Sequence, residues 1–199
     1  MDHGAQFRRV ASVFCLVAAP AVIVAAFVFA PFGNDETGKE IVNAVALNQW
    51  SYTVAPVTLT VGIFLLIPAV VTALGLAATR APYLAYIGGG MAIAGYVALP
   101  MTFVGPQVAM ALSATGASPE QSATVIDKLL SGSVVLNLFS AVFVTGHIVG
   151  TTILGVALIR SRVIAGWAGA SVAVSQPIHL VAHIIESKPI DVLAAKLPG

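Results

Sequence analysis

Charged residues are scarce in this chain, and their scarcity indicates its class. Only 9% of the 199 residues are Asp, Glu, Lys or Arg, 58% are hydrophobic, and the mean hydropathy is +0.97. Soluble domains carry about a quarter charged residues. The formal net charge is +1, and no run of like charge offers a basic face to nucleic acid. The composition therefore predicts an integral membrane protein whose first partner is the lipid bilayer, with no nucleic-acid partner.

Cysteine pairs and the common catalytic motifs are also missing. Cys15 is the only cysteine, so no internal disulfide can form. No Walker, GxGxxG, GxSxG or HExxH pattern occurs. A single HxxxH does not make a di-iron membrane desaturase, and no carboxylate falls in the centre of the bundle. These absences argue against an ATP-driven pump, a rhomboid-like hydrolase and a membrane terpene cyclase.

Five apolar stretches are long enough to cross the hydrocarbon layer of a membrane. They cover about residues 10–32, 55–79, 81–105, 134–159 and 163–186. A layer of ~30 Å takes roughly 20 helical residues at 1.5 Å each. The first stretch is longer than the ~7–15 apolar residues of a signal peptide, so we interpret it as a retained anchor. We expect an all-α, single-domain transmembrane bundle of about five helices.

The arginines predict the orientation of this bundle. All five of them, Arg8, Arg9, Arg80, Arg160 and Arg162, fall on one side of the predicted membrane. Cytoplasmic loops retain arginine and lysine, whereas here the lysines and most acidic residues fall on the opposite side. We therefore expect a multi-pass protein of a bacterial-type cytoplasmic membrane, with its N-terminus in the cytoplasm and its C-terminus outside.

Two short helices are predicted in the outer loops. Ile41 and Val45 recur at helical spacing, and Trp50 follows as an aromatic anchor. Ser118 and Gln121 have the spacing of a capping box with proline between them, which predicts the start of a second helix. Both helices are expected at the outer membrane interface, either as a lid over the bundle or simply as connections between spans.

Ionisable residues inside membrane helices are costly, so the few present are the first candidates for function. Stretch 134–159 carries His147 inside Gly146-His-Ile-Val-Gly150, whose small residues allow another helix to approach closely. Tyr96 adds a polar group in stretch 81–105, and Asn137 adds one in the same stretch as His147. We expect both to face the same space as His147.

The last stretch carries the other polar side chains. Counted from Gln176, three further polar residues follow at offsets of three, seven and ten: His179, His183 and Glu186. This spacing places all four on one helical face. With His147 they predict a polar track that runs from the outer surface to the middle of the membrane.

Four interpretations of this track stay open. The polar side chains can simply tie helices together, as in a structural or accessory subunit. They can instead bind a lipophilic small molecule, with His147 and His179 as candidate acid and base. Gln176, His183, Glu186, Tyr96 and Asn137 would then contact the ligand. This second interpretation is our leading hypothesis.

The remaining two interpretations involve a bound group, although no cofactor can be named from the sequence. A metal ion would take His179, His183 and Glu186, which offer ligands of the kind that zinc or copper accepts. A b-type haem or a quinone would lie between His147 and His179. Measured from the centres of their spans, however, these two histidines differ by about four residues, or ~6 Å in depth.

One resemblance supports the class of the protein. The segment from Gly146 to Arg160 reads GHIVGTTILGVALIR, and it is followed by Trp167-Ala-Gly and by Ser175-Gln-Pro-Ile-His179. These segments resemble the C-terminal half of uncharacterised multi-spanning bacterial membrane proteins, over about a third of the chain. The resemblance implies a membrane bundle and no particular activity. The glycine-rich faces are also compatible with a homo-oligomer.

Overall fold

The computed structural model describes residues 3–29 and 37–184, and every element in these ranges is helical. The α-helices are α1 (His3–Phe29), α2 (Gly38–Leu47), α3 (Gln49–Ala78), α4 (Pro82–Ala98), α5 (Val104–Ala114), α6 (Pro119–Gly132), α7 (Val134–Thr145), α8 (Thr151–Ser161) and α9 (Gly166–Ile184). A 3-10 turn, η1 (Leu99–Phe103), joins α4 to α5, and a π-helical turn, η2 (Gly146–Gly150), joins α7 to α8. The all-α prediction is confirmed for the described residues.

Four helical segments are long and apolar enough to cross a membrane. They are Arg9–Ala26, Gln49–Ala78, Pro82–Ala114 and Val134–Ser161. Each of the first four predicted spans falls on one of these membrane-capable helices. Residues 30–32 of the first span lie outside the described residues, the second helix already begins at Gln49, and the third continues past residue 105 to Ala114 through η1. The fifth predicted stretch forms α9, whose polar side chains lower its hydropathy below that of the other four. The count of five stays a prediction.

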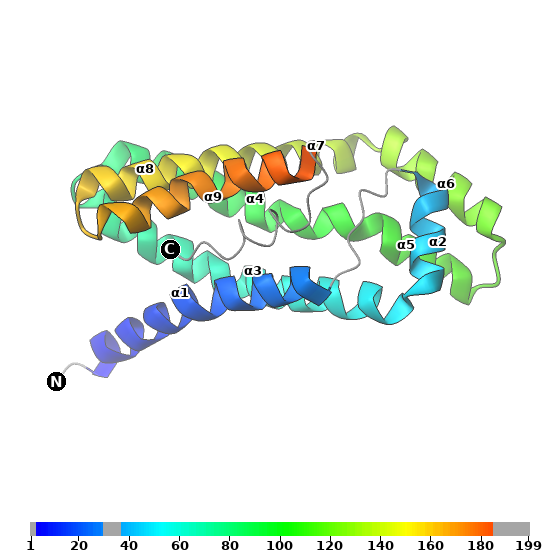
Figure 1. Ribbon diagram of the computed structural model, residues 1–199, viewed down its shortest axis with the longest axis horizontal. Coiled ribbons are helices and arrows are strands. Elements are labelled where there is room, and N and C mark those ends of the chain that lie inside the picture. The colour runs from blue at the N-terminus through cyan, green and yellow to red at the C-terminus, as the bar shows by residue number, and fades with distance from the viewer. Residues whose placement is uncertain (1–2, 30–36, 185–199) are drawn as a thin grey trace.

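The long helices run beside one another along the length of the molecule (Figure 1). The start of α1 and the turns after α3 and α8 lie at the same end, which carries Arg9, Arg80, Arg160 and Arg162. We call this the arginine end. Arg80 ties two of these turns together, because its guanidinium donates to the carbonyl oxygen of Ser161 at 3.3 Å. At the opposite end, α2, α5 and α6 gather into what we call the outer cap (Figure 1).

Glycines permit a close helix crossing between α4 and the η2–α8 segment. A Cβ atom added to Gly146 would lie 2.8 Å from the Cα atom of Gly95, and one added to Gly88 would lie 3.0 Å from the Gly150 carbonyl oxygen. Real Cβ contacts are longer than this, so only glycine permits the two backbones to approach so closely. The predicted close approach at Gly146 and Gly150 is confirmed, and its partner is α4.

The outer cap has a small core of its own. Ile41 and Val45 of α2 are buried with Ile126 of α6, and Tyr52 and Ala109 complete the cluster. The backbone N–H of Gly38 at the start of α2 donates to the Asp127 Oδ1 atom at 2.6 Å. The apolar faces of α2 and α6 therefore pack against the protein. The two helices are confirmed, whereas their position in the membrane interface stays a prediction.

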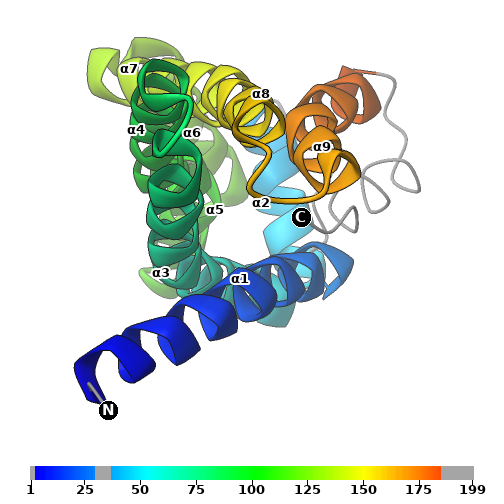
Figure 2. The same ribbon diagram turned by 90° about the vertical axis from the view of Figure 1, so that its left-hand side faces the viewer.

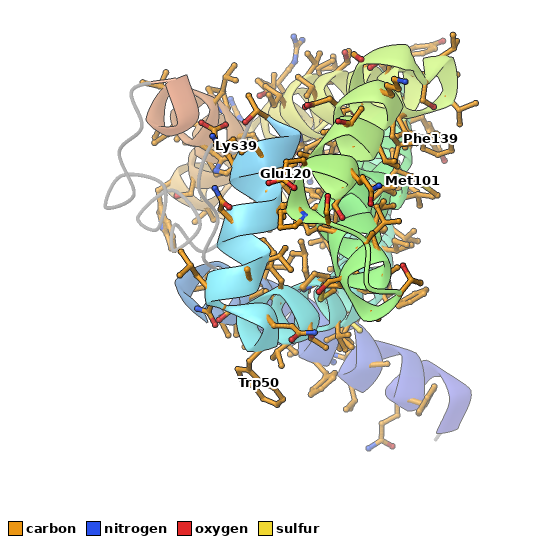
Figure 3. The ribbon with its side chains drawn as sticks, turned by 90° about the vertical axis from the view of Figure 1, so that its right-hand side faces the viewer. Lys39, Trp50, Met101, Glu120 and Phe139 are labelled. Atoms are coloured by element: carbon orange, nitrogen blue, oxygen red, sulfur yellow. The ribbon has the colours of Figure 1, made fainter. Side chains whose placement is uncertain are left out.

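Helices α2 and α6 of the outer cap each begin with a capping box. The hydroxyl of Thr37 accepts from the Glu40 backbone N–H, and the hydroxyl of Ser118 accepts from the Gln121 backbone N–H, as the spacing of Ser118 and Gln121 predicts. The backbone N–H of Glu120, the Ser118 hydroxyl and the nearby Lys39 ammonium lower the pKa of the Glu120 carboxyl. Figure 3 shows Lys39 and Glu120 close together at this end and Trp50 pointing away from the bundle.

The glycine crossing predicts opposite effects at two positions of α4. Gly95→Ala places a methyl group against the backbone of Gly146 and His147, so it should cost about 1–3 kcal/mol of stability. Gly90→Ala is the matched control, because nothing lies within 4 Å of its added Cβ and alanine is the better helix former by up to ~1 kcal/mol. Thermal melting of the detergent-purified variants measures both. Equal melting temperatures would contradict the crossing.

The Gly38–Asp127 bond predicts local coupling inside the outer cap. Asp127→Ala removes the acceptor and should cost about 1 kcal/mol, which speeds amide hydrogen exchange in α2 roughly fivefold. Asp127→Asn keeps a side-chain oxygen at the same place and should restore most of the protection. If α2 exchanges equally fast in all three proteins, the bond does not hold the cap together.

Candidate functional site

A cavity of about 490 Å³ lies inside the bundle at the depth of the membrane helices. Its walls come from α1 and α3 on one side and from η2, α8 and α9 on the other, with Tyr96 of α4 and Leu99 of η1 at one end. Figure 2 looks at the arginine end and shows α1 and α9 as separate helices that stand apart.

Within the described residues, no helix closes the flank of the cavity between α1 and α9, which we call the open flank. Among the described residues, α1 packs against α3, and α9 packs against α8 and η2, but α1 and α9 do not contact each other. On the other side, Gly155 and Gly169 let α9 lie close against α8, near Ala173 and Ile159 respectively.

His147 lies at the polar end of the cavity and is held by its own helix. Its side chain is only 5% exposed, and its ring stacks on Phe143 with centroids 4.3 Å apart and planes inclined by 4°. Its Nδ1 atom lies 3.1 Å from the Phe143 carbonyl oxygen, which can only accept a hydrogen bond, so Nδ1–H is the donor. The residue belongs to the π-helical turn η2, a type of turn that is frequent at functional sites.

Three of the predicted site residues surround His147. The side chain of Gln176 lies near its ring, and the rings of Tyr96 and His179 have their centroids 6.0 Å from its own. The Tyr96 hydroxyl lies 3.4 Å from the Thr151 hydroxyl. Tyr96, His147, Gln176 and His179 all line the cavity, as the polar track predicts.

The expected difference in depth between His147 and His179 is not supported. His147 precedes the end of α8 at Ser161 by fourteen residues, and His179 follows the start of α9 at Gly166 by thirteen, so both stand at nearly equal distances from their shared turn. Their ring centroids lie 6.0 Å apart. The sequence estimate measured depth from the centres of apolar stretches, whose ends do not coincide with the ends of the helices.

Other predicted site residues are not brought to this cluster. The structure places Asn137 on an exposed face of α7 and not among the residues that line the cavity, so its predicted ligand contact is not supported. The backbone of His183 belongs to α9, but its side chain and the whole of Glu186 lie outside the described residues. The metal set of His179, His183 and Glu186 therefore stays a prediction. Within the described ranges, no three His, Cys, Asp or Glu side chains converge.

Some lining groups escaped the sequence reasoning. Thr151 follows His147 by four residues, so the helical period alone could have placed it on the same face. Ser175 adjoins Gln176, but it lines the cavity only because of how α9 leans on α8. Helical periodicity in the sequence cannot reveal that Phe143 stacks on His147. It also cannot reveal the π-helical turn.

The chemistry available in the cavity is that of uncharged polar groups. Hydroxyl, amide and imidazole groups can donate and accept hydrogen bonds, and imidazole can also move protons. No Asp, Glu, Lys or Arg is among the lining residues that the structure describes. The rest of the wall is apolar.

Comparisons with protein-family models, with curated proteins and with solved structures give no match to this chain. The resemblance to uncharacterised bacterial membrane proteins accordingly stays a prediction.

The burial of His147 predicts that its removal lowers the stability of the protein, whereas removal of the exposed Asn137 side chain does not. His147→Ala removes a buried ring, its stacking on Phe143 and the bond to the Phe143 carbonyl, so we expect a loss of about 2–4 kcal/mol. Asn137→Ala should be nearly neutral, because its side chain is exposed. Detergent melting curves measure both. A wild-type melting temperature for His147→Ala would show that its burial contributes no stability.

Proposed function

We propose that this protein binds a lipophilic small molecule in the cavity between α1, α3, α8 and α9. The observation that supports this most directly is an apolar cavity of about 490 Å³ that carries a cluster of polar side chains at one end. Binding sites for small molecules measure roughly 300–1,000 Å³ and combine apolar walls with a few polar groups that orient the ligand. The open flank between α1 and α9 supports access from the bilayer.

A chemical step on the ligand would fall to His147 and His179. Their rings face the same space 6.0 Å apart, and histidine is the side chain best suited to proton transfer near neutral pH. No carboxylate is among the described residues that line the cavity, so a strong-acid mechanism is not part of this proposal.

The topology that we propose places α9 in the membrane as a fifth span and the arginine end in the cytoplasm of a bacterial-type cell. The gathering of Arg9, Arg80, Arg160 and Arg162 at one end supports the orientation. The length of α3 supports the position of the cap, since its 30 residues extend about 45 Å, close to the thickness of a bilayer with its headgroups. On this reckoning α2 and α6 lie at the level of the outer headgroups.

A structural or accessory subunit is the rival from another class. The bond from His147 to the Phe143 carbonyl and the approach of Tyr96 to Thr151 show that part of the polar cluster is satisfied within the protein. In that case the cavity would be filled nonspecifically by lipid. A haem or metal protein would instead give a Soret band or a stoichiometric metal in the purified sample.

Binding can be tested with N-phenyl-1-naphthylamine, a neutral lipophile that fluoresces in apolar surroundings. We expect saturable binding to the wild type, and at least a tenfold loss of affinity in Val172→Trp, which places a large ring in the cavity. Val174→Trp is the matched control, because Val174 lies on the same helix, is 44% exposed and does not line the cavity.

The two variants should share the melting temperature of the wild type to within a few degrees. Binding of the probe to Val172→Trp with wild-type affinity, at unchanged stability, would place the probe outside the cavity and refute the proposed site.

A further inference from the structure

The polarity of the cavity changes in one direction along its length. On the segment formed by η2 and α8, the lining residues run from His147 and Thr151 to Leu154 and Leu158. Leu158 follows His147 by eleven residues, which is about 16 Å of helix. On α9 the same change runs from His179 and Gln176 to Val172 and Ala168. The cavity is therefore polar toward the outer cap and apolar toward the arginine end.

No Asp, Glu, Lys or Arg side chain lines the polar end within the described residues. A phosphate or carboxylate buried there would lose its hydration without gaining a lysine or arginine partner, which is costly in a membrane interior. A cationic head would likewise find no carboxylate among the described lining residues. The groups at hand suit a single neutral oxygen, either a carbonyl that accepts or a hydroxyl that does both.

The depth of the polar end also limits the size of the head group. His147 precedes Ser161 at the arginine end by fourteen residues, or about 21 Å of helix. Across a hydrocarbon layer of ~30 Å, this position lies well below the outer headgroups. A phospholipid head would have to leave the interface to reach it at high cost, whereas a small uncharged head can enter the hydrocarbon at a much lower cost.

We infer that the ligand is an uncharged amphiphile with one small carbonyl or hydroxyl head and a slender apolar body, bound with its head at His147 and Gln176 and its body toward Leu158. This inference rests on the proposed function and adds the ligand class and its orientation. From the outer leaflet, such a molecule can enter between α1 and α9, which do not contact each other within the described residues, without turning over.

Ligand class is tested by displacing N-phenyl-1-naphthylamine from the wild-type protein in nanodiscs with three competitors of equal chain length. We expect 1-hexadecanol to displace the probe at a mole fraction at least tenfold lower than palmitate or hexadecylphosphocholine. Equal or stronger displacement by either charged competitor overturns the inference and leaves the proposed function standing. If the probe does not bind at all, the proposed function itself fails.

The role of the polar end is tested by Gln176→Leu, which removes the amide and keeps a similar volume. We define the preference as the logarithm of the ratio of the mole fractions at which palmitate and hexadecanol displace the probe, and we expect Gln176→Leu to lose at least half of it. The control is Asn137→Leu, which removes an exposed amide that does not line the cavity and should keep the whole preference. A preference unchanged in Gln176→Leu overturns the assignment of the head to this end.

Orientation is tested with single tryptophan reporters in a Trp50→Phe, Trp167→Phe background. Phe143→Trp places a reporter at the polar end, and Ile164→Trp places one at the arginine end of the same cavity. Hexadecanol that carries bromine at the end of its chain should quench the reporter at position 164 at least twice as strongly as the one at 143. The reverse order overturns the proposed orientation.

Discussion

The close crossing of α4 with the η2–α8 segment determines the positions of the candidate site. Gly95 and Gly146 bring the two backbones into direct contact, which leaves no space between these helices and places Tyr96 and His147 side by side. In a membrane, where lipid tails are as apolar as the side chains, such close packing is a main source of helix association. Because Tyr96 and His147 each follow one of these glycines directly, their rings emerge beside the contact, into the cavity.

The cavity arises because the flanking helices do not close over this central pair. α1 packs along α3, and α9 packs along α8. In the described part of the chain, α1 and α9 do not contact each other. Long side chains of α3 and α8 line the resulting space, and a few uncharged polar groups lie at its outer end. The pairing of an apolar cavity with a small neutral polar end suits a lipophile better than an ion, a nucleotide or a charged lipid head.

The sequence predicted the class, the main helices and most of the central cluster, because hydropathy and the helical period are local properties. The Gly146–Gly150 spacing indicated a close crossing, but it could not identify α4 as the partner, which depends on tertiary packing. Asn137 was misplaced because a polar residue in an apolar stretch does not reveal which face it occupies. The depths of His147 and His179 were misjudged because the ends of apolar stretches differ from helix ends, and the π-helical turn has no periodic signature.

The central claim, that the cavity holds a lipophilic small molecule, is tested most directly on the protein as purified. The measurement is mass spectrometry of a solvent extract of the wild-type protein, washed free of bulk lipid, with an absorption spectrum and elemental analysis of the same sample. The account predicts a colourless, metal-free protein that releases about one uncharged lipophilic molecule per chain. A Soret band, a stoichiometric metal, or an extract containing only bulk phospholipid would contradict it.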